Sequence, residues 1–191
     1  DIKQTPKYSM KTLTYHEATP GHHHQIAHSL ENDDLTIYRR FGYGTSAFSE
    51  GWALYAERLS LEAGLAPDLY DELGILQSEI FRSVRLVVDT GMHYKKWTRE
   101  EAIDYMKDMT GMSDTECRVE IERYIVWPGQ ALSYKVGMIK ILELRERAME
   151  QLGEKFSIKD FHSAVLDNGN PPLFIVEQMV DEMIAKGLRN N

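Results

Sequence analysis

The residues best suited to chemistry are concentrated in one stretch near the start of the chain. Five of the seven histidines lie between positions 15 and 28, within YHEATPGHHHQIAH. In helical zinc sites, two histidines one turn apart hold the ion, and a glutamate beside the first acts as general base toward a water. His16 and Glu17 match the start of this pattern, but Pro20 stands where the second histidine is expected. The stretch therefore predicts a catalytic zinc site with altered ligand spacing.

The spacing decides which histidine can join His16. In an unbroken helix His22 would be rotated by roughly 240° from His16, and His23 would face the same way but lie ~10 Å further along the axis. Pro20 lacks an N–H and clashes with the carbonyl one turn back, and Gly21 permits backbone angles closed to other residues. We therefore expect a break or two-residue bulge that brings His22 opposite His16, with His23 as the substitute if the bulge is one residue longer.

Two other interpretations of this histidine cluster stay open. His24 and His28 are spaced by one helical turn and form a possible metal-binding pair, but Gln25 rather than a glutamate follows His24, so that pair lacks a base. Histidine runs also occur as solvated surface segments or adventitious metal sites. The catalytic interpretation therefore needs a third ligand from elsewhere in the chain.

A carboxylate commonly completes a zinc site with two histidines and leaves a fourth position for water. The segment SEGWALYAERL supplies Glu50 and Glu57, which share one helix face but lie ~10 Å apart along its axis. Burying two acids there is costly unless they are paired or bind metal. We predict Glu50 as the third ligand, because Gly51 beside it permits close approach, and Glu57 as the residue that orients a ligand histidine or binds a neighbouring cation. The alternative is an amphipathic helix with solvated acids.

Further polar groups surround a second Pro-Gly break at positions 128–129. Tyr134 is the candidate for stabilising the oxyanion that forms when water attacks a carbonyl. A core tyrosine with a satisfied hydroxyl is the alternative. Arg123 and Lys135 are candidates for binding a substrate carboxylate, although such residues on helices are more often solvated or salt-bridged.

The two remaining histidines lie far from the cluster in sequence. His93 follows Gly91 near the end of a long helical pattern and is a candidate hydrogen-bond donor to substrate or transition state. A simple contact with the helix dipole is the alternative. His162 has no partner signal and is interpreted as structural. The turn at 167–170 is a possible border of the cleft, though turns of this composition need no function.

Helical patterns account for almost the whole chain, and they must position these groups. Thr98 with Glu101 and Ser113 with Glu116 form capping boxes. No alternating strand, internal repeat or low-complexity linker is evident. We therefore predict one all-α domain over residues 1–191, with a loop at 32–46 and helices at about 9–17, 22–31, 47–63, 68–91, 99–109, 114–125, 130–151, 157–166 and 173–186.

Helix stops and the longest apolar pattern add detail to this prediction. Glycines close three helices, at Gly64, near Gly153 and at Gly187. The longest helix carries an apolar stripe of three- and four-residue steps, made up of Leu69, Leu73, Leu76, Ile80, Val84 and Val87.

Composition excludes several classes of protein. The chain has 191 residues, enough for a sizeable core, and its 42% hydrophobic content excludes a disordered chain. The net charge of 22 − 30 = −8, without a basic tract, argues against nucleic acid or an anionic membrane as partner. The single cysteine, Cys117, excludes an internal disulfide, and no apolar run reaches the ~20 residues of a membrane helix. Residues 1–10 do not resemble a signal peptide, and we expect a fragment or processed product.

A family resemblance is carried by three segments, in the order HEATPGHHHQ, SEGWALYAERL and RYIVWPGQALSYKVGMIKILELR. Together they resemble the bacterial domain-of-unknown-function family 885, whose members are similar to gluzincin metallopeptidases and include many predicted lipoproteins. The resemblance runs from about Tyr8 to the C-terminus. It implies a gluzincin-type helical fold, a zinc ion held by His16, His22 and Glu50, and Glu17 as base. It also implies the C-terminal catalytic part of a longer protein of the bacterial envelope, whether periplasmic or a lipoprotein, but no particular substrate.

The predicted function is zinc-dependent hydrolysis, and the resemblance favours peptide bonds as the substrate. Glu17 takes a proton from the attacking water and hands it to the leaving amine, while Tyr134 or His93 holds the oxyanion. The alternative is a catalytically silent helical domain that binds zinc or a partner in an exported bacterial protein. We expect the N-terminal portion of the same protein to pack against this chain, so the fragment alone can lack activity.

Overall fold

The computed structural model describes residues 6–42 and 44–189, and every regular element within these ranges is helical. The prediction of an all-α chain is confirmed. No described helix is long and apolar enough to cross a membrane. In chain order the elements are α1 (Ser9–Glu17), α2 (His22–Glu31), α3 (Ile37–Phe41), α4 (Ser46–Glu62), α5 (Leu69–His93), α6 (Arg99–Thr110), α7 (Asp114–Val126), η2 (Gln130–Leu132), α8 (Ser133–Leu152), η3 (Gly153–Lys155), α9 (Ile158–Leu166) and α10 (Leu173–Arg189).

Local capping determines where several helices begin. Both predicted capping boxes form, with Glu101 accepting from the Thr98 N–H at 2.7 Å and Glu116 accepting from the Ser113 N–H at 3.0 Å. Asp68 caps α5 by accepting from two backbone N–H groups of its first turn. These bonds satisfy amides that have no partner within the helix, which explains why helix starts were predictable from residue type.

Helix α4 is buried on nearly all sides and organises the larger core. Its side chains Phe48, Trp52 and Tyr55 are fully buried. Helix α8 crosses α4 where Gly51 meets Gly137, so closely that a Cβ on Gly51 would lie 2.5 Å from the Gly137 Cα. A larger residue at either position would push the two helices apart. Helices α9 and α10 complete this core. Its buried side chains include Ile141 and Leu144 of α8, Phe161 and Val165 of α9, and Val176 and Val180 of α10.

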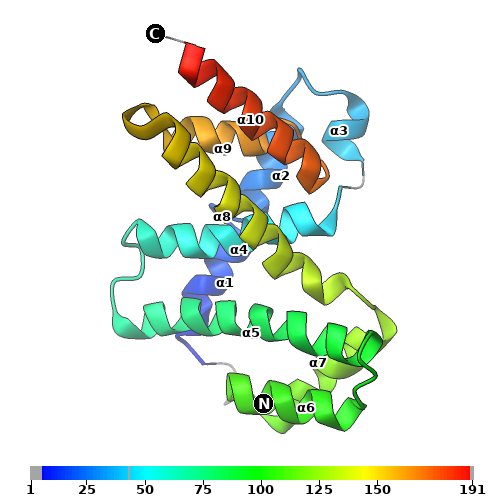
Figure 1. Ribbon diagram of the computed structural model, residues 1–191. Coiled ribbons are helices and arrows are strands. Elements are labelled where there is room, and N and C mark those ends of the chain that lie inside the picture. The colour runs from blue at the N-terminus through cyan, green and yellow to red at the C-terminus, as the bar shows by residue number, and fades with distance from the viewer. Residues whose placement is uncertain (1–5, 43, 190–191) are drawn as a thin grey trace.

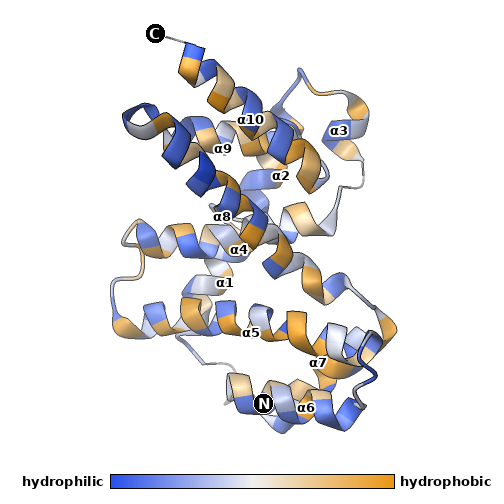
Figure 2. Ribbon diagram, viewed as in Figure 1, coloured by the Kyte–Doolittle hydropathy of each residue, from blue (hydrophilic) through white to orange (hydrophobic). Residues whose placement is uncertain are grey.

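A second core lies among α5, α6 and α7. Its buried members include Val88, Ile103, Met106, Ile121 and Tyr124. Helix α1 contacts both α4 and α5, and Figure 1 shows it between these two helices in the middle of the molecule. Figure 2 shows hydrophobic and hydrophilic residues mixed along most helices, as expected where each helix buries one face.

Some predicted details differ from the structure. The loop predicted at 32–46 contains the short helix α3, and the helix predicted from 130 begins with a 3-10 turn before α8. Gly187 does not end α10, which continues to Arg189. A Cβ on Gly187 would lie 2.7 Å from the Leu152 Cδ2, so this glycine is explained by close packing rather than by helix termination.

Of the predicted apolar stripe of α5, Val84 is the one member that is buried. Val84 is 3% exposed, whereas Leu69, Leu73 and Leu76 are 81%, 48% and 46% exposed. Helical periodicity indicates which residues share a face, but it does not show what covers that face. The first half of α5 therefore presents apolar surface that no described residue covers.

Candidate metal centre

The segment between α1 and α2 is built around Gly21. A Cβ on this residue would lie 1.9 Å from the carbonyl oxygen of His16, so only glycine fits against the end of α1. The carbonyl of Pro20 accepts a 2.9 Å hydrogen bond from Trp52 Nε1, which ties the segment to α4. The helix interruption predicted at Pro20 and Gly21 is therefore present, and α4 holds it in place.

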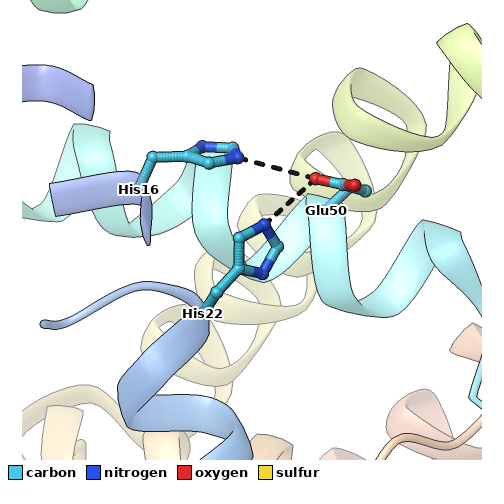
Figure 3. A group of neighbouring side chains, drawn as sticks. All are labelled: His16, His22 and Glu50. Carbon is cyan, nitrogen blue, oxygen red and sulfur yellow. Dashed lines mark ion pairs between the residues drawn. The ribbon is translucent and has the colours of Figure 1, made fainter. Parts of the chain in front are cut away.

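This interruption brings His16 and His22 together beside Glu50 of α4. Nε2 of His16 lies 3.5 Å, and Nε2 of His22 lies 3.2 Å, from the same oxygen, Oε2 of Glu50. Figure 3 shows both nitrogens directed at that carboxylate. Two ligand atoms that each lie ~2.05 Å from a tetrahedral zinc ion are ~3.35 Å apart. The two nitrogen-to-oxygen distances fit that spacing, and all three ligand atoms lie within 4.8 Å of one another.

A buried chain of hydrogen bonds supports His16 from behind. Its Nδ1 lies 2.7 Å from Oε1 of Glu57, and the other carboxylate oxygen of Glu57 accepts a 2.6 Å bond from the Thr12 hydroxyl. All three side chains are buried. A carboxylate on Nδ1 fixes the tautomer and ring orientation that leave Nε2 free to bind a metal.

The charges at the site favour an ionised Glu50. Burial raises the pKa of its carboxyl, but the adjacent imidazoles of His16 and His22 outweigh burial and lower the pKa to about 2. Burial lowers the pKa of His16, yet Glu50 and Glu57 outweigh it and the net pKa is raised. The centre thus holds a carboxylate anion at neutral pH, the form that binds cations.

The donor set fits a zinc ion. Oε2 of Glu50 is buried and has no hydrogen bond of acceptable geometry, although two imidazole nitrogens face it. A buried polar oxygen without a partner is costly, and a cation between the three groups would satisfy it. Two imidazole nitrogens and one carboxylate oxygen match the zinc sites that keep a fourth position open.

The predicted base and the alternative ligand both lie at the surface. Glu17, the last residue of α1, is exposed, and its side chain makes no hydrogen bond or ion pair with another described residue. His23 is exposed as well and is not one of the three converging groups. Of the two histidines that the spacing allowed as partners of His16, the structure brings in His22.

Tyr134 of α8 lies directly against the centre. Its ring is stacked on that of His16, with centroids 6.1 Å apart and planes 18° apart. Its hydroxyl makes no hydrogen bond with another described residue. On the side of α5, the guanidinium groups of Arg85 and Arg82 lie 4.6 Å and 5.8 Å from the same ring centroid. The tyrosine ring therefore lies against a ligand histidine, and its hydroxyl has no partner among the described residues.

Three other predicted site residues make internal contacts instead. His93 Nε2 lies 3.0 Å from the carbonyl oxygen of Tyr124, which links α5 to α7. Arg123 forms an ion pair within α7, and Lys135 forms a 2.7 Å ion pair with Glu79 of α5. None of these contacts reaches His16, His22 or Glu50, so the structure does not bring the three residues into the centre.

The remaining histidines hold other parts of the fold together. The rings of His24 and His28 lie 6.2 Å apart, and His28 pairs with Asp167 at 2.7 Å. The turn at 167–170 thus anchors α2. His162 lies 2.8 Å from the Tyr55 hydroxyl, and burial together with a nearby arginine lowers its pKa to about 4. A structural role for His162 agrees with these contacts.

Sequence reasoning did not single out Thr12, Arg82 or Arg85. Thr12 precedes His16 by one helical turn and so shares its face, a signal that was available. Arg82 and Arg85 are spaced by one turn on helix α5. Arginines on a helix are commonly solvated, and nothing in the pattern indicated that Arg85 is buried and Arg82 half-buried.

Comparison with known proteins identifies relatives of the chain. Residues 1–180 match the family described as "Bacterial protein of unknown function (DUF885)". The crystal structure of a "putative lipoprotein" from Colwellia psychrerythraea is similar over 97% of the chain, at 51% identity and a TM-score of 0.93. A "putative lipoprotein of unknown function" from Shewanella oneidensis is similar over 93%, at 28% identity and a TM-score of 0.85. The chain spans 32% of the length of each. No curated protein matches the chain.

Proposed function

We propose that this chain, which belongs to the DUF885 family of bacterial proteins of unknown function, holds one zinc ion and hydrolyses peptide bonds. The observation that supports this most strongly is the convergence of His16, His22 and Glu50, whose two nitrogen-to-oxygen distances match the spacing of zinc ligands. The buried bond from Glu57 to His16 Nδ1 adds to it, because such partners are typical of metal-ligating histidines.

The ligand set is also the reason for proposing hydrolysis. Two histidines and one glutamate are the protein ligands of catalytic zinc in well-known peptidases. A zinc ion here would supply Lewis acidity to polarise a carbonyl and to lower the pKa of a water. Glu17, exposed and directly after His16, is the proposed general base that takes a proton from the attacking water and delivers it to the leaving amine.

Oxyanion stabilisation is assigned to Tyr134. Its ring lies against His16, and its hydroxyl makes no hydrogen bond with another described residue. A free hydroxyl beside the metal position can donate to the negative oxygen that develops on the attacked carbonyl. His93 is the less favoured donor, because its Nε2 contacts the Tyr124 carbonyl.

We further propose that additional polypeptide of the same protein packs on this chain. The relatives of solved structure are about three times as long, since the chain spans 32% of each. The exposed leucines at the start of α5 supply apolar surface for such packing. Both relatives are described as a "putative lipoprotein", and this description supports a location in the bacterial envelope.

Metal binding is tested on the full-length protein by elemental analysis after dialysis. We expect about one zinc per chain. His16→Ala and Glu50→Ala should each remove it, because two ligands hold zinc far more weakly than three. His28→Ala, a surface histidine paired with Asp167, is the matched control and should retain the ion. Full zinc content in both ligand variants would show that the metal lies elsewhere or binds adventitiously.

Catalysis is tested with Glu17→Gln against a peptide library. This variant should keep zinc and lose hydrolysis, because the amide cannot accept the proton. Glu31→Gln, an exposed acid at the end of α2, is the control. If the zinc-loaded wild-type protein cleaves nothing in the library, the chain is better described as a silent zinc-binding domain.

A further inference from the structure

Arg82 of α5 is an unusual charge in this fold. Among the described arginines that are wholly or partly buried, it is the one with no carboxylate within ion-pair distance. Its Nη1 donates to the Ser78 hydroxyl at 2.8 Å, and its buried Nε has no hydrogen-bond partner. By contrast Arg85, one turn further on, is paired with Glu120 at 2.9 Å. A half-buried guanidinium without a paired carboxylate is costly to keep, so this position favours an anionic ligand.

Arg82 lines a pocket that has room for such a ligand. The pocket has a volume of about 470 Å³ and lies among α1, α5 and the link from α6 to α7. Leu13, Phe81 and Met112 form apolar walls, and the Gln77 amide, also in the lining, has no hydrogen-bond partner among the described residues. The acid in the wall, Glu116, is already engaged in the capping box of α7. The side-chain donors left over for a ligand therefore include Arg82 and Gln77, together with the hydroxyls of Tyr8 and Ser78.

The pocket lies next to the candidate metal centre. Thr12 lines it and also donates to Glu57, which in turn binds the ligand His16. Thr12 and His16 are one turn of α1 apart, a rise of ~6 Å. The Arg82 guanidinium lies 5.8 Å from the ring centroid of Tyr134, and this ring also contacts Arg85 and stacks on the His16 ring. An extended peptide covers ~3.5 Å per residue, so the rise from Thr12 to His16 corresponds to about two residues of a bound peptide.

From this geometry we propose that the pocket is a substrate subsite in which Arg82, assisted by Gln77, binds a carboxylate of the peptide while an apolar side chain packs on Leu13, Phe81 and Met112. The carboxylate belongs either to the C-terminus of the substrate or to an acidic side chain, and the two share the same chemistry. The role as a substrate subsite rests on the proposed peptidase function. Carboxylate binding by Arg82 is measurable without it.

The test is calorimetric titration of the full-length, zinc-loaded Glu17→Gln protein. The probes are N-acetyl-Gly-Phe with a free carboxylate, its C-terminal amide, and N-acetyl-Gly-Glu-amide, which carries its only carboxylate on the side chain. We expect at least one acidic probe to bind about 10- to 100-fold more tightly than the neutral amide, the range for a charge-assisted hydrogen bond. Which acidic probe binds identifies the source of the carboxylate.

Adding Arg82→Gln to the Glu17→Gln protein should lower its affinity for the acidic probe to its affinity for the neutral amide. Adding Arg82→Lys instead should retain part of the difference between the two affinities. Arg147→Gln, an arginine paired with Glu177 on another face, should change nothing. Because Arg82 has no ion pair to lose, Arg82→Gln should leave the unfolding temperature unchanged or raised, whereas a purely structural arginine would lower it.

Equal binding of acidic and neutral probes by the Glu17→Gln parent, no binding of any probe, or unchanged binding in Arg82→Gln would overturn the subsite. These results are separable from those for the centre. Arg82-dependent binding in a protein that takes up no zinc and cleaves no peptide would refute the proposed function alone. If zinc content and hydrolysis are as expected but Arg82→Gln does not change probe binding, the subsite alone is refuted.

Discussion

Replacing Glu57 tests whether the buried carboxylate sets the metal affinity. Glu57 binds Nδ1 of His16 and accepts from Thr12, and it does not itself touch the metal position. Glu57→Gln keeps the size of the side chain and an oxygen that can accept from His16, but it removes the negative charge. Glu57→Ala removes both and leaves the His16 and Thr12 groups without a buried partner. The two variants therefore separate charge from geometry.

The expected magnitudes follow from this difference. Loss of a carboxylate partner behind a ligand histidine typically weakens metal binding about 10- to 100-fold. We expect Glu57→Gln near the lower end, because ring orientation is retained, and Glu57→Ala near the upper end. Glu57→Ala should also lower the free energy of unfolding by about 1–3 kcal/mol, the cost of stranding a buried polar group.

Zinc affinity is measured by competition with a chromophoric chelator, and stability by urea unfolding of the zinc-free protein. Glu62→Gln, at the exposed end of the same helix where Glu62 pairs with Arg145, is the control and should leave zinc affinity unchanged. If both Glu57 variants bound zinc as tightly as the wild type while His16→Ala lost it, the bond to Nδ1 would have no part in positioning the ligand.

Two further predictions concern the break between α1 and α2 and the pH dependence of stability. Gly21→Ala places a Cβ 1.9 Å from the His16 carbonyl oxygen and should cost about 2–4 kcal/mol of unfolding free energy and also weaken zinc binding; an unchanged urea midpoint would contradict it. Burial and Arg145 hold the pKa of folded His162 at about 4, below the ordinary 6.5. Only the unfolded chain is then protonated between these values, so this contribution destabilises the fold as the pH falls from 6.5 toward 4. After allowance for solvent screening it amounts to about 1–2 kcal/mol, and urea unfolding of His162→Gln should lack it.

Helix placement was largely predictable because its signals are local. The bounds of α1 and α2 match the prediction residue for residue, since the Pro20-Gly21 pair prevents a continuous helix whatever surrounds it. Ser113 and Thr98 cap helices through neighbours three residues away. Gly187 was misjudged, because its requirement comes from Leu152 of another helix and not from the chain around it.

The candidate centre was predictable where the chemistry of the residue types leaves few choices. The His16-Glu17 pair, with Pro20 in the place of the second histidine, indicated a ligand beyond the break. Glu50 was the acid best placed on a neighbouring helix. Gly51 was expected to permit close approach to Glu50, but it packs against Gly137 of α8 and so serves the contact between two helices. The membership of the chain in its family is confirmed by the match over residues 1–180.

By itself the sequence determined the all-α class, the break at Pro20-Gly21 and the residue types available to a metal, because each depends on near neighbours along the chain. Tertiary structure decided that His22 rather than His23 reaches His16, because the path from α1 to α2 depends on Trp52 of α4 holding the break. It also decided that Lys135 forms an ion pair with Glu79, whereas Arg82 has no carboxylate within ion-pair distance. Such pairings join helices distant in sequence, and no local pattern encodes them.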